Sequence, residues 1–386
     1  MCGIAGVIQF NGEMVDVTTV VRQMTDCVAH RGPDDVGVLR LSCGAFGHRR
    51  LAVIDVTHGR QPMQRMIGEH AYTIIYNGEL YNTAILRSEL ESLGYIFETA
   101  SDTEVVLLSY VAWGEDCSKY LDGIFAFAVW DAAERQLFLC RDRLGVKPLF
   151  YAEIMNGIVF GSEMKALFVH PGVVPAVTEA RLGKMLAFGP MRLPGETVFR
   201  QVMELLPGEQ AIIDADGMRR AFYWQLPKEP LELTVDETLR EVRRLIEDAV
   251  AKQLVSDVPL CTFLSGGVDS SIISAVASRH FALRGERLPT FSVEYEGNAD
   301  YFEANAFQPA EDRAFIAEMC KMLPIDHTEV VVNQADLAEH LYTVLSLKDY
   351  PSMVDIDSSL YLFCREVKKE YTVAISGECA DELFGG

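Results

Sequence analysis

The hydrophobic pattern of the chain changes about halfway along, and this change limits the folds that the chain can adopt. The first half consists of short apolar runs separated by turn residues, a pattern typical of antiparallel strands. Helical spacing interrupts these runs after Asn82 and again after Ser101, which has capping-box spacing to Glu104. We therefore expect antiparallel sheets with helices packed outside them. The expected strands are residues 5–10, 46–55, 72–76, 123–130, 136–140, 157–161 and 210–213.

The second half alternates helices and strands. Thr234 and Glu237 again have capping-box spacing, and apolar residues follow at helical spacing. A strand over 259–264, a glycine turn, a helix from Val268 and a strand over 290–293 come next. A strand, a crossover helix and a second strand in this order predict a parallel sheet.

Turn residues gather between the two patterns, which predicts a domain boundary there. We expect a first domain over residues 2–210, a linker over 211–235 and a second domain over 236–386. After residue 294 the chain is long and acidic up to residue 315, and we expect a solvated, mobile loop in that stretch.

Charge and cysteine content exclude several classes of function. The net charge of −22 disfavours binding to nucleic acid or to an anionic membrane. No apolar run approaches the ~18 residues of a membrane-spanning helix, and no signal-peptide pattern is present, so we expect a cytoplasmic protein. The nine cysteines are odd in number and form no Cys-x-x-Cys pair, which argues against a disulfide framework and a zinc site.

Residues 265–271 are the sharpest motif, because they stand between a predicted strand and a predicted helix. Two glycines let backbone N–H groups close on a phosphate, and the helix N-terminus adds its positive end. The motif is not a Walker A loop, and Asp269 inside it suits Mg²⁺ rather than phosphate. The alternative interpretation is an ordinary glycine-rich turn with a surface carboxylate.

Cys2 is a candidate nucleophile. If Met1 is removed, one residue carries a thiol of pKa ~8.5 and an α-amine of pKa ~7.7 to 8.0, so the amine can accept the thiol proton. Alone this signal is weak, since many chains carry an early cysteine that has no catalytic role.

Several motifs occur in the order found in one family, the glutamine-hydrolysing asparagine synthetases. Residues 265–271 and 376–386 resemble the synthetase domain of that family, and the resemblance covers essentially the whole chain. The motifs that resemble its glutaminase domain are residues 1–6, 30–34, 48–51, 76–79, 102–104, 122–127 and 141–149.

The resemblance implies a fold and a set of glutaminase residues. The expected fold is an α+β N-terminal nucleophile hydrolase sandwich (αββα), followed by an α/β ATP-pyrophosphatase domain with a parallel sheet. Cys2 would attack the side-chain amide of glutamine, and Asn77 and Gly78 would form the oxyanion hole. Arg50 would bind the α-carboxylate and Asp102 the α-ammonium of glutamine. The rest of the glutamine pocket would come from Leu51, Val53, Ile54 and Glu79. The alternative interpretation makes Arg50 and Asp102 members of surface ion pairs, and it makes Asn77-Gly78 a hairpin turn.

The resemblance also implies an ATP site with Mg²⁺ on Asp269 and Asp381. ATP would adenylate the acceptor carboxylate, ammonia would attack the acyl-adenylate, and Glu378 would handle the protons of the incoming ammonia. An ordinary helix-start carboxylate is the other interpretation of Glu378. The ATP contacts would come from Leu264, Ser265, Gly266, Gly267, Asp269, Ser270, Ser271, Val293, Ser376 and Gly377.

The expected activity is a carbon–nitrogen ligase that makes asparagine from aspartate, ATP and glutamine; a homodimer is also an expected state. Residues 351–359 depart from the family pattern because Asp355 stands near the place of an expected arginine. Two alternatives therefore stay open: an amidotransferase of the same architecture for another carboxylate, and a non-catalytic relative. Because Gly386 directly follows a glycine-rich motif, we also expect the chain to be C-terminally truncated.

Overall fold

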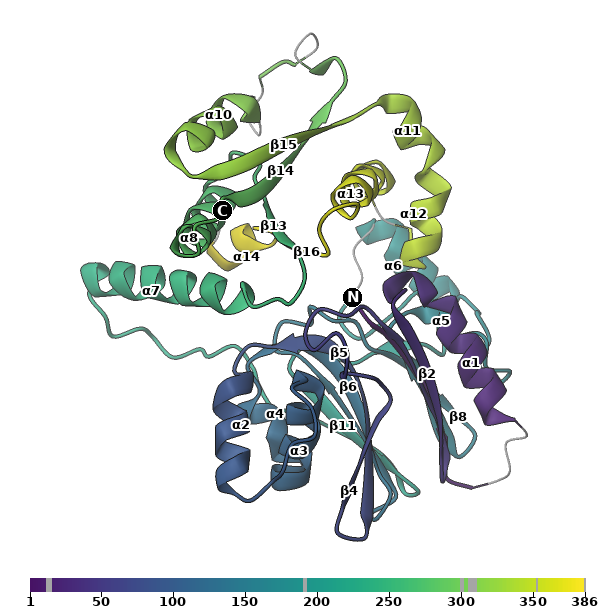
Figure 1. The fold of residues 1–386 in the computed structure, drawn as a ribbon. Coiled ribbons are helices and arrows are strands. Elements are labelled where there is room, and N and C mark those ends of the chain that lie inside the picture. Colours follow the sequence, from purple (N-terminus) through teal and green to yellow (C-terminus); the bar gives the residue numbers. More distant parts are fainter. Residues whose placement is uncertain (12–15, 190–192, 299–301, 305–310, 352, 385–386) are drawn as a thin grey trace. The chain divides into compact units, whose positions relative to one another are not determined.

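The computed structural model describes residues 1–11, 16–189, 193–298, 302–304, 311–351 and 353–384, and the chain divides into two compact units (Figure 1). Unit 1 comprises Met1–Lys228 and the short segment Lys348–Ser352. Unit 2 comprises Glu229–Leu347 and Met353–Gly386. No helix in the described ranges is both long and apolar enough to cross a membrane.

Unit 1 contains two six-stranded antiparallel sheets. The first has the strand order β10-β8-β9-β1-β3-β2, and the second has the order β12-β11-β7-β6-β5-β4. The strands of the first sheet are β1 (Gly3–Gln9), β2 (Asp35–Leu41), β3 (Gly44–Arg50), β8 (Phe150–Ile154), β9 (Gly157–Gly161) and β10 (Met203–Glu204). The strands of the second are β4 (Met63–Ile67), β5 (His70–Leu80), β6 (Gly123–Asp131), β7 (Gln136–Arg141), β11 (Glu209–Asp214) and β12 (Gly217–Phe222).

Three apolar clusters stack these sheets and the helices of unit 1 into four layers. The central cluster takes residues from both sheets, including Ile4, Ile75 and Phe160. The second lies between the second sheet and helices α2 and α3, and the third lies between the first sheet and helices α1 and α5. The expected αββα sandwich is thus confirmed. The helices are α1 (Val17–Cys27), α2 (Thr83–Ser92), α3 (Asp102–Trp113), α4 (Cys117–Tyr120), α5 (Met164–Leu167) and α6 (Glu179–Phe188), with 3₁₀ turns η1 (Ala29–Arg31) and η2 (Gly114–Asp116).

Unit 2 is built on a four-stranded parallel sheet with the order β15-β14-β13-β16. Apolar residues of α7, α8 and α10 cover one face of this sheet, and residues of α13 cover the other. The predicted parallel sheet is therefore confirmed. The strands are β13 (Leu260–Phe263), β14 (Leu288–Tyr295), β15 (Ile325–Val332) and β16 (Val373–Ile375). The helices are α7 (Val235–Gln253), α8 (Val268–Leu283), α10 (Asp312–Met322), α11 (Gln334–Glu339), α12 (Leu341–Lys348), α13 (Val354–Val367) and α14 (Ala380–Phe384).

Three local expectations differ from the structure. The strand expected to run to residue 55 ends at Arg50, because the Arg50 guanidinium donates to the carbonyls of residues 54–56 and curls that stretch into a loop. The linker expected over 211–235 is wrong in its first part, since β11 and β12 extend the second sheet. The acidic loop expected to reach residue 315 ends earlier, because Asp312 begins α10, and part of that loop lies outside the described residues.

One capping expectation is also wrong. Ser101 caps α3 by accepting from the Thr103 N–H, but Glu104 does not reach back to the cap. Its buried carboxylate instead binds the backbone N–H groups of Glu98 and Thr99 and pairs with Arg65. By contrast, the box of Thr234 and Glu237 at the start of α7 forms in both directions.

Candidate active site

Cys2 lies immediately before β1, where the first sheet brings it to the loop that follows β3. Gly3 pairs with Arg49 in the β1–β3 register, so Cys2 faces the end of β3. Its Sγ lies 3.4 Å from the Leu51 N–H, which donates to it, and 3.6 Å from the Leu51 carbonyl. Burial raises the pKa of the Cys2 thiol, while the Leu51 N–H and the charge of the chain N-terminus act in the opposite direction.

Arg50 is buried and organises this loop. Its Nη1 donates to the carbonyl of Val56 at 2.9 Å, and its Nη2 donates to the carbonyls of Ile54 and Asp55 at 3.2 and 2.6 Å. Val53 belongs to the same loop. Arg50, the residue expected to bind the α-carboxylate of glutamine, therefore also holds this loop in place. Sequence analysis did not predict this second role.

Strand β5 carries the expected oxyanion-hole residues at its carboxyl end. The Asn77 side chain is 1% exposed, and its Nδ2 has no hydrogen-bond partner among the described residues. Gly78 pairs with Phe125 in β6, and a Cβ at residue 78 would lie 2.5 Å from the carbonyl oxygen of Ile124. Only glycine permits this close approach of the two strands. A buried amide without a partner is costly to keep, so the Asn77 Nδ2 is a candidate donor to a ligand.

Asp102, the first residue of α3, is held against β5. One of its oxygens, Oδ2, accepts from the Tyr76 hydroxyl at 3.1 Å and from the Leu80 N–H at 3.2 Å. Burial raises the pKa of Asp102 to about 6, although these hydrogen bonds oppose the rise. The negative charge of Asp102 also raises the pKa of Cys2, so the two groups are electrostatically coupled.

Buried polar contacts join the two sheets beside this site, and sequence analysis missed them. His48 of β3 lies with its Nε2 3.1 Å from the carbonyl oxygen of Tyr76 in β5. The Gln61 side chain bonds both the N–H and the carbonyl of Tyr76. Burial lowers the pKa of His48 to about 4, so His48 is neutral and Nε2 donates this bond. These contacts fix β5 relative to the strands that carry Cys2 and Arg50.

Lys147 is a further buried charge that the sequence motif did not reveal. Its N–H donates to the Oδ2 of Asp142, which also accepts from the N–H of Phe125, the partner of Gly78. Burial lowers the pKa of Lys147, and the charge of Glu79 opposes this shift. Glu79, which is expected to bind glutamine, therefore has a cationic neighbour.

A second candidate site lies in unit 2 at the carboxyl ends of β13 and β16. Strand β13 pairs in parallel with β14 on one side and β16 on the other, so the sheet changes its direction of growth at this point. Ligands of open α/β sheets bind at such switch points. A cavity of about 400 Å³ opens there. Its lining includes the expected Leu264, Ser265, Gly267, Asp269, Ser270, Val293, Ser376, Gly377, Glu378 and Asp381.

Hydroxyl groups in the loop between β13 and α8 form hydrogen bonds across that loop. Ser270 Oγ accepts from the Ser265 N–H at 3.1 Å and contacts Ser265 Oγ at 3.0 Å. Gly266 has a φ of 84°, in the left-handed region that favours glycine. The expected residues Gly266 and Ser271 belong to this loop and helix but do not line the cavity.

Asp269 and Asp381 provide the carboxylate oxygens that Mg²⁺ prefers, and both line the cavity. Within the described ranges, no group of three or more His, Cys, Asp or Glu residues is placed to hold a metal ion unaided. Two carboxylates fit a magnesium ion that also binds substrate phosphates and water. The departure from the family pattern at residues 351–359 falls partly outside the description, since Ser352 and the side chain of Asp355 are not described.

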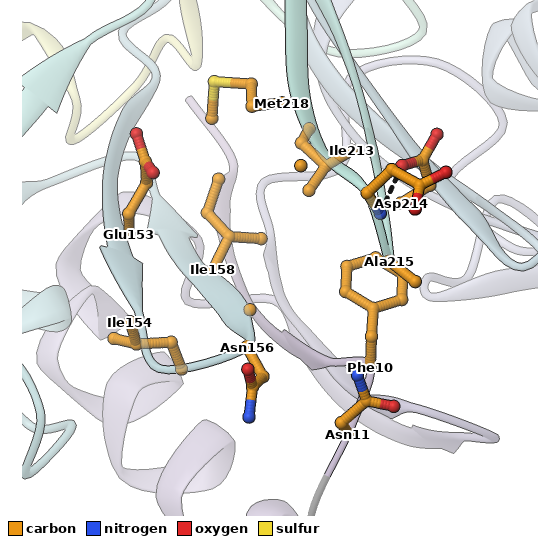
Figure 2. Close-up of a pocket in the computed structure, with 13 residues that line it drawn as sticks. Phe10, Asn11, Glu153, Ile154, Asn156, Ile158, Ile213, Asp214, Ala215 and Met218 are labelled. Carbon is orange, nitrogen blue, oxygen red and sulfur yellow. Dashed lines mark hydrogen bonds between the residues drawn. The ribbon is translucent and has the colours of Figure 1, made fainter.

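A cavity of about 210 Å³ in unit 1 lies away from these residues (Figure 2). Its walls come from Phe10, the β8–β9 turn at Asn156 and the β11–β12 turn at Asp214. Phe10 and Cys2 flank opposite ends of β1. This cavity is therefore separate from Cys2.

The chain matches two protein-family models. Residues 1–224 match a model described as glutamine amidotransferase domain, and residues 241–386 match one described as asparagine synthase. The chain is 48% identical over 387 residues to asparagine synthetase [glutamine-hydrolyzing] 3 of Bacillus subtilis, with all of this chain and 63% of that protein aligned. It is 36% identical to asparagine synthetase [glutamine-hydrolyzing] 1 of the same organism, covering 59% of it.

A third relative is covered more fully. The chain is 30% identical over 407 residues to putative asparagine synthetase [glutamine-hydrolyzing] 2 of Methanocaldococcus jannaschii, with all of this chain and 75% of that protein aligned. The chain thus spans less than two thirds of the Bacillus relatives and three quarters of the Methanocaldococcus one.

Proposed function

Because the chain belongs to the family of glutamine-hydrolysing asparagine synthetases, we propose that it hydrolyses glutamine at Cys2 and supplies the ammonia for ATP-dependent synthesis of asparagine from aspartate. The observation that supports this proposal best is the unpartnered, buried Asn77 Nδ2 on a strand fixed beside the loop that holds Cys2. An inert relative has no reason to keep a buried donor without an acceptor.

In the proposed first reaction, the Cys2 sulfur attacks the side-chain amide carbon of glutamine. With Met1 removed, the α-amine of Cys2 takes the thiol proton and passes it to the leaving ammonia. Asn77 Nδ2 and the Gly78 N–H stabilise the oxyanion of the tetrahedral intermediate. Water then cleaves the glutamyl thioester, which releases glutamate and frees the thiol.

The glutamine backbone is proposed to bind between Arg50 and Asp102. The guanidinium of Arg50 carries donors beyond the three that hold the loop, and these suit the α-carboxylate. Asp102 uses Oδ2 for Tyr76 and Leu80, and its negative charge suits the α-ammonium. Glu79 and the backbone of Leu51 complete the pocket.

In the proposed second reaction, ATP binds at the switch point of unit 2. Ser265, Gly267 and Ser270 hold its phosphates with backbone N–H and hydroxyl donors, and Asp269 and Asp381 would hold a Mg²⁺ ion that would supply positive charge against the phosphates. The aspartate side-chain carboxylate attacks the α-phosphate, and pyrophosphate leaves. Ammonia then attacks the acyl-adenylate and AMP leaves, with Glu378 as the proton acceptor.

The proposed function is tested by its products. The protein is assayed for glutamate release from glutamine, and for asparagine and AMP when glutamine, aspartate and ATP are supplied together. We expect AMP to form in proportion to asparagine. A panel of other carboxylates replaces aspartate in parallel, and AMP formation with one of them but not with aspartate would contradict the proposed acceptor.

Glutamine binding should weaken in acid because of Asp102. The pKa of this carboxyl is about 6, so it becomes neutral below that pH and loses its attraction for the α-ammonium. Below pH 6 we expect kcat/KM for glutamine to fall by a further factor of about ten per pH unit, beyond the loss caused by protonation of the Cys2 α-amine, and mainly through KM. Asp102→Asn should raise KM at every pH and remove this inflection. Asp116→Asn, which affects only a surface pair with Lys119, is the control. An unchanged inflection in Asp102→Asn would exclude this role.

Asp269→Asn should separate the two activities. The substitution keeps the size of the side chain but removes one proposed magnesium ligand, so we expect synthesis of asparagine to fall ~10²-fold or more. Glutamate release should stay within about twofold of the wild type, because Cys2 belongs to the other unit. Asp248→Asn, at a surface pair with Lys252 on α7, is the matched control. Equal loss of both activities in Asp269→Asn would indicate a structural role.

A further inference from the structure

A five-residue segment that interrupts the sequence of unit 2 belongs to unit 1. Lys348–Ser352 belongs to unit 1, although the residues on both sides of it belong to unit 2. Tyr350 is buried in the apolar cluster between the first sheet and helices α1 and α5. Asp349 adopts a φ of 57°, a conformation uncommon for residues other than glycine. We name Lys348–Ser352 the latch segment.

A chain of charged contacts runs from the latch segment to the nucleophile. Asp349 accepts from Lys165 twice, through the backbone N–H and through Nζ, both at 2.9 Å. Lys165 Nζ lies 2.7 Å from Glu163 Oε2, and Glu163 Oε1 accepts from Arg31 Nη1 at 2.9 Å. Arg31 Nε then donates to the carbonyl oxygen of Cys2 at 2.8 Å.

These contacts are strong because most of the side chains in this series are shielded from water. The side chains of Arg31, Glu163 and Asp349 are 9, 10 and 10% exposed, and that of Lys165 is 26% exposed. Burial acts to raise the pKa of Glu163, but hydrogen bonds from His30, Lys165 and Arg31 outweigh it and lower the pKa to about 2. Loss of one charge from such a series leaves a buried charge unbalanced.

The series of charged contacts ends at the backbone of Cys2, the residue whose position matters most for the proposed reaction. Leu51 holds the Cys2 sulfur, and Arg31 holds the Cys2 carbonyl. A displacement of a reacting group by about 1 Å can cost ~10² in rate. The orientation of Arg31 is set by Glu163, whose other oxygen depends on Lys165 and thus on Asp349.

We propose that the latch segment sets the position of the nucleophile, with Asp349, Lys165 and Glu163 as positioning residues that act through Arg31. The latch segment begins at the last residue of α12 and ends before α13, so the polypeptide enters and leaves it through residues assigned to unit 2. The kinetic part of this inference rests on the proposed glutaminase activity.

The test is Asp349→Asn in the 386-residue chain, which removes the charge and keeps the shape. We expect kcat per Cys2 site, counted by titration with a diazoketone analogue of glutamine, to fall about tenfold while KM for glutamine stays constant. Lys165→Met should behave alike and Lys165→Arg should restore most of the rate. The double variant Asp349→Asn/Lys165→Met should be no slower than Lys165→Met, since both act in one series. Glu196→Gln, at the exposed ion pair with Lys184, is the control and should change nothing.

A second readout separates this inference from the proposed function. Hydrogen exchange of the amides of residues 3–5 should quicken in Asp349→Asn and not in Glu196→Gln, whether or not glutamine is the substrate. Absence of glutamine hydrolysis in the wild type would overturn the proposed function alone. Unchanged exchange at residues 3–5, or a loss of rate that appears only in KM, would overturn the latch.

Discussion

Replacing Cys2 with alanine is expected to reduce glutamine hydrolysis to the background rate. The variant has no sulfur to form the thioester, and the remaining binding and oxyanion groups have no nucleophile to assist. Burial keeps the pKa of the thiol high, so the α-amine released by removal of Met1 must act as its base. A variant with one extra residue retained before Cys2 should therefore lose most of its activity too. Glutamate release is the measurement, and ammonia-supported synthesis should survive in both variants.

A second cysteine provides the matched control. Cys43 lies in the turn between β2 and β3 of the same sheet, and its Sγ contacts Arg135 at the surface. Cys43→Ala should keep the wild-type rate, because this thiol is not part of the site around Leu51. Hydrolysis that persists in Cys2→Ala in proportion to enzyme concentration, but is lost in Cys43→Ala, would contradict the proposed role of Cys2 and place the nucleophile at Cys43.

Periodicity and capping made much of the secondary structure predictable. The capping box of Thr234 and Glu237 forms as expected, and the strand over 157–161 has the expected bounds. In unit 2, the strand, turn and helix around residues 259–283 are local features, so they follow from local sequence. Packing against the other layers then adds to propensities already present.

Local pattern failed where a distant partner competed for the same group. The carboxylate of Glu104 fits a capping box, but buried Arg65 and the N–H groups of Glu98 and Thr99 bind it instead. Likewise, apolar residues after Arg50 suggested a longer strand, yet the guanidinium draws three carbonyls out of the sheet. In both cases a buried charge must be satisfied, and this requirement outweighs a modest local propensity.

The positioning residues were beyond the reach of sequence analysis for a different reason. Lys165 and Asp349 are separated by 184 positions, and neither lies in a motif that marks a site. Glu163 precedes a helix of only four residues, so periodicity gives it no recognisable role. A nucleophilic role for Cys2 can be proposed from the sequence because that chemistry depends on its place in the sequence, whereas the charges around it depend on the folded topology.

Replacing Asn77 with alanine is the second substitution expected to have a large effect, because it removes a donor and no visible bond. The oxyanion of the proposed intermediate loses one of two donors, so kcat should fall ~10² to 10³-fold with little change in KM. The Asn77 Nδ2 has no partner among the described residues, so its removal should cost little stability and the melting temperature should change only slightly.

Asn82→Ala is the control that separates catalysis from folding. The Asn82 side chain donates to the Tyr120 carbonyl at 2.9 Å and accepts from the Asp122 N–H at 3.1 Å, so its loss should lower the melting temperature. The kcat of this variant should stay at the wild-type value, since the Asn82 side chain bonds only the backbone of residues 120 and 122. The two variants are thus expected to show opposite behaviour in rate and in stability. A stable, fully active Asn77→Ala would remove the oxyanion role, while an unstable and inactive one would make Asn77 a structural residue.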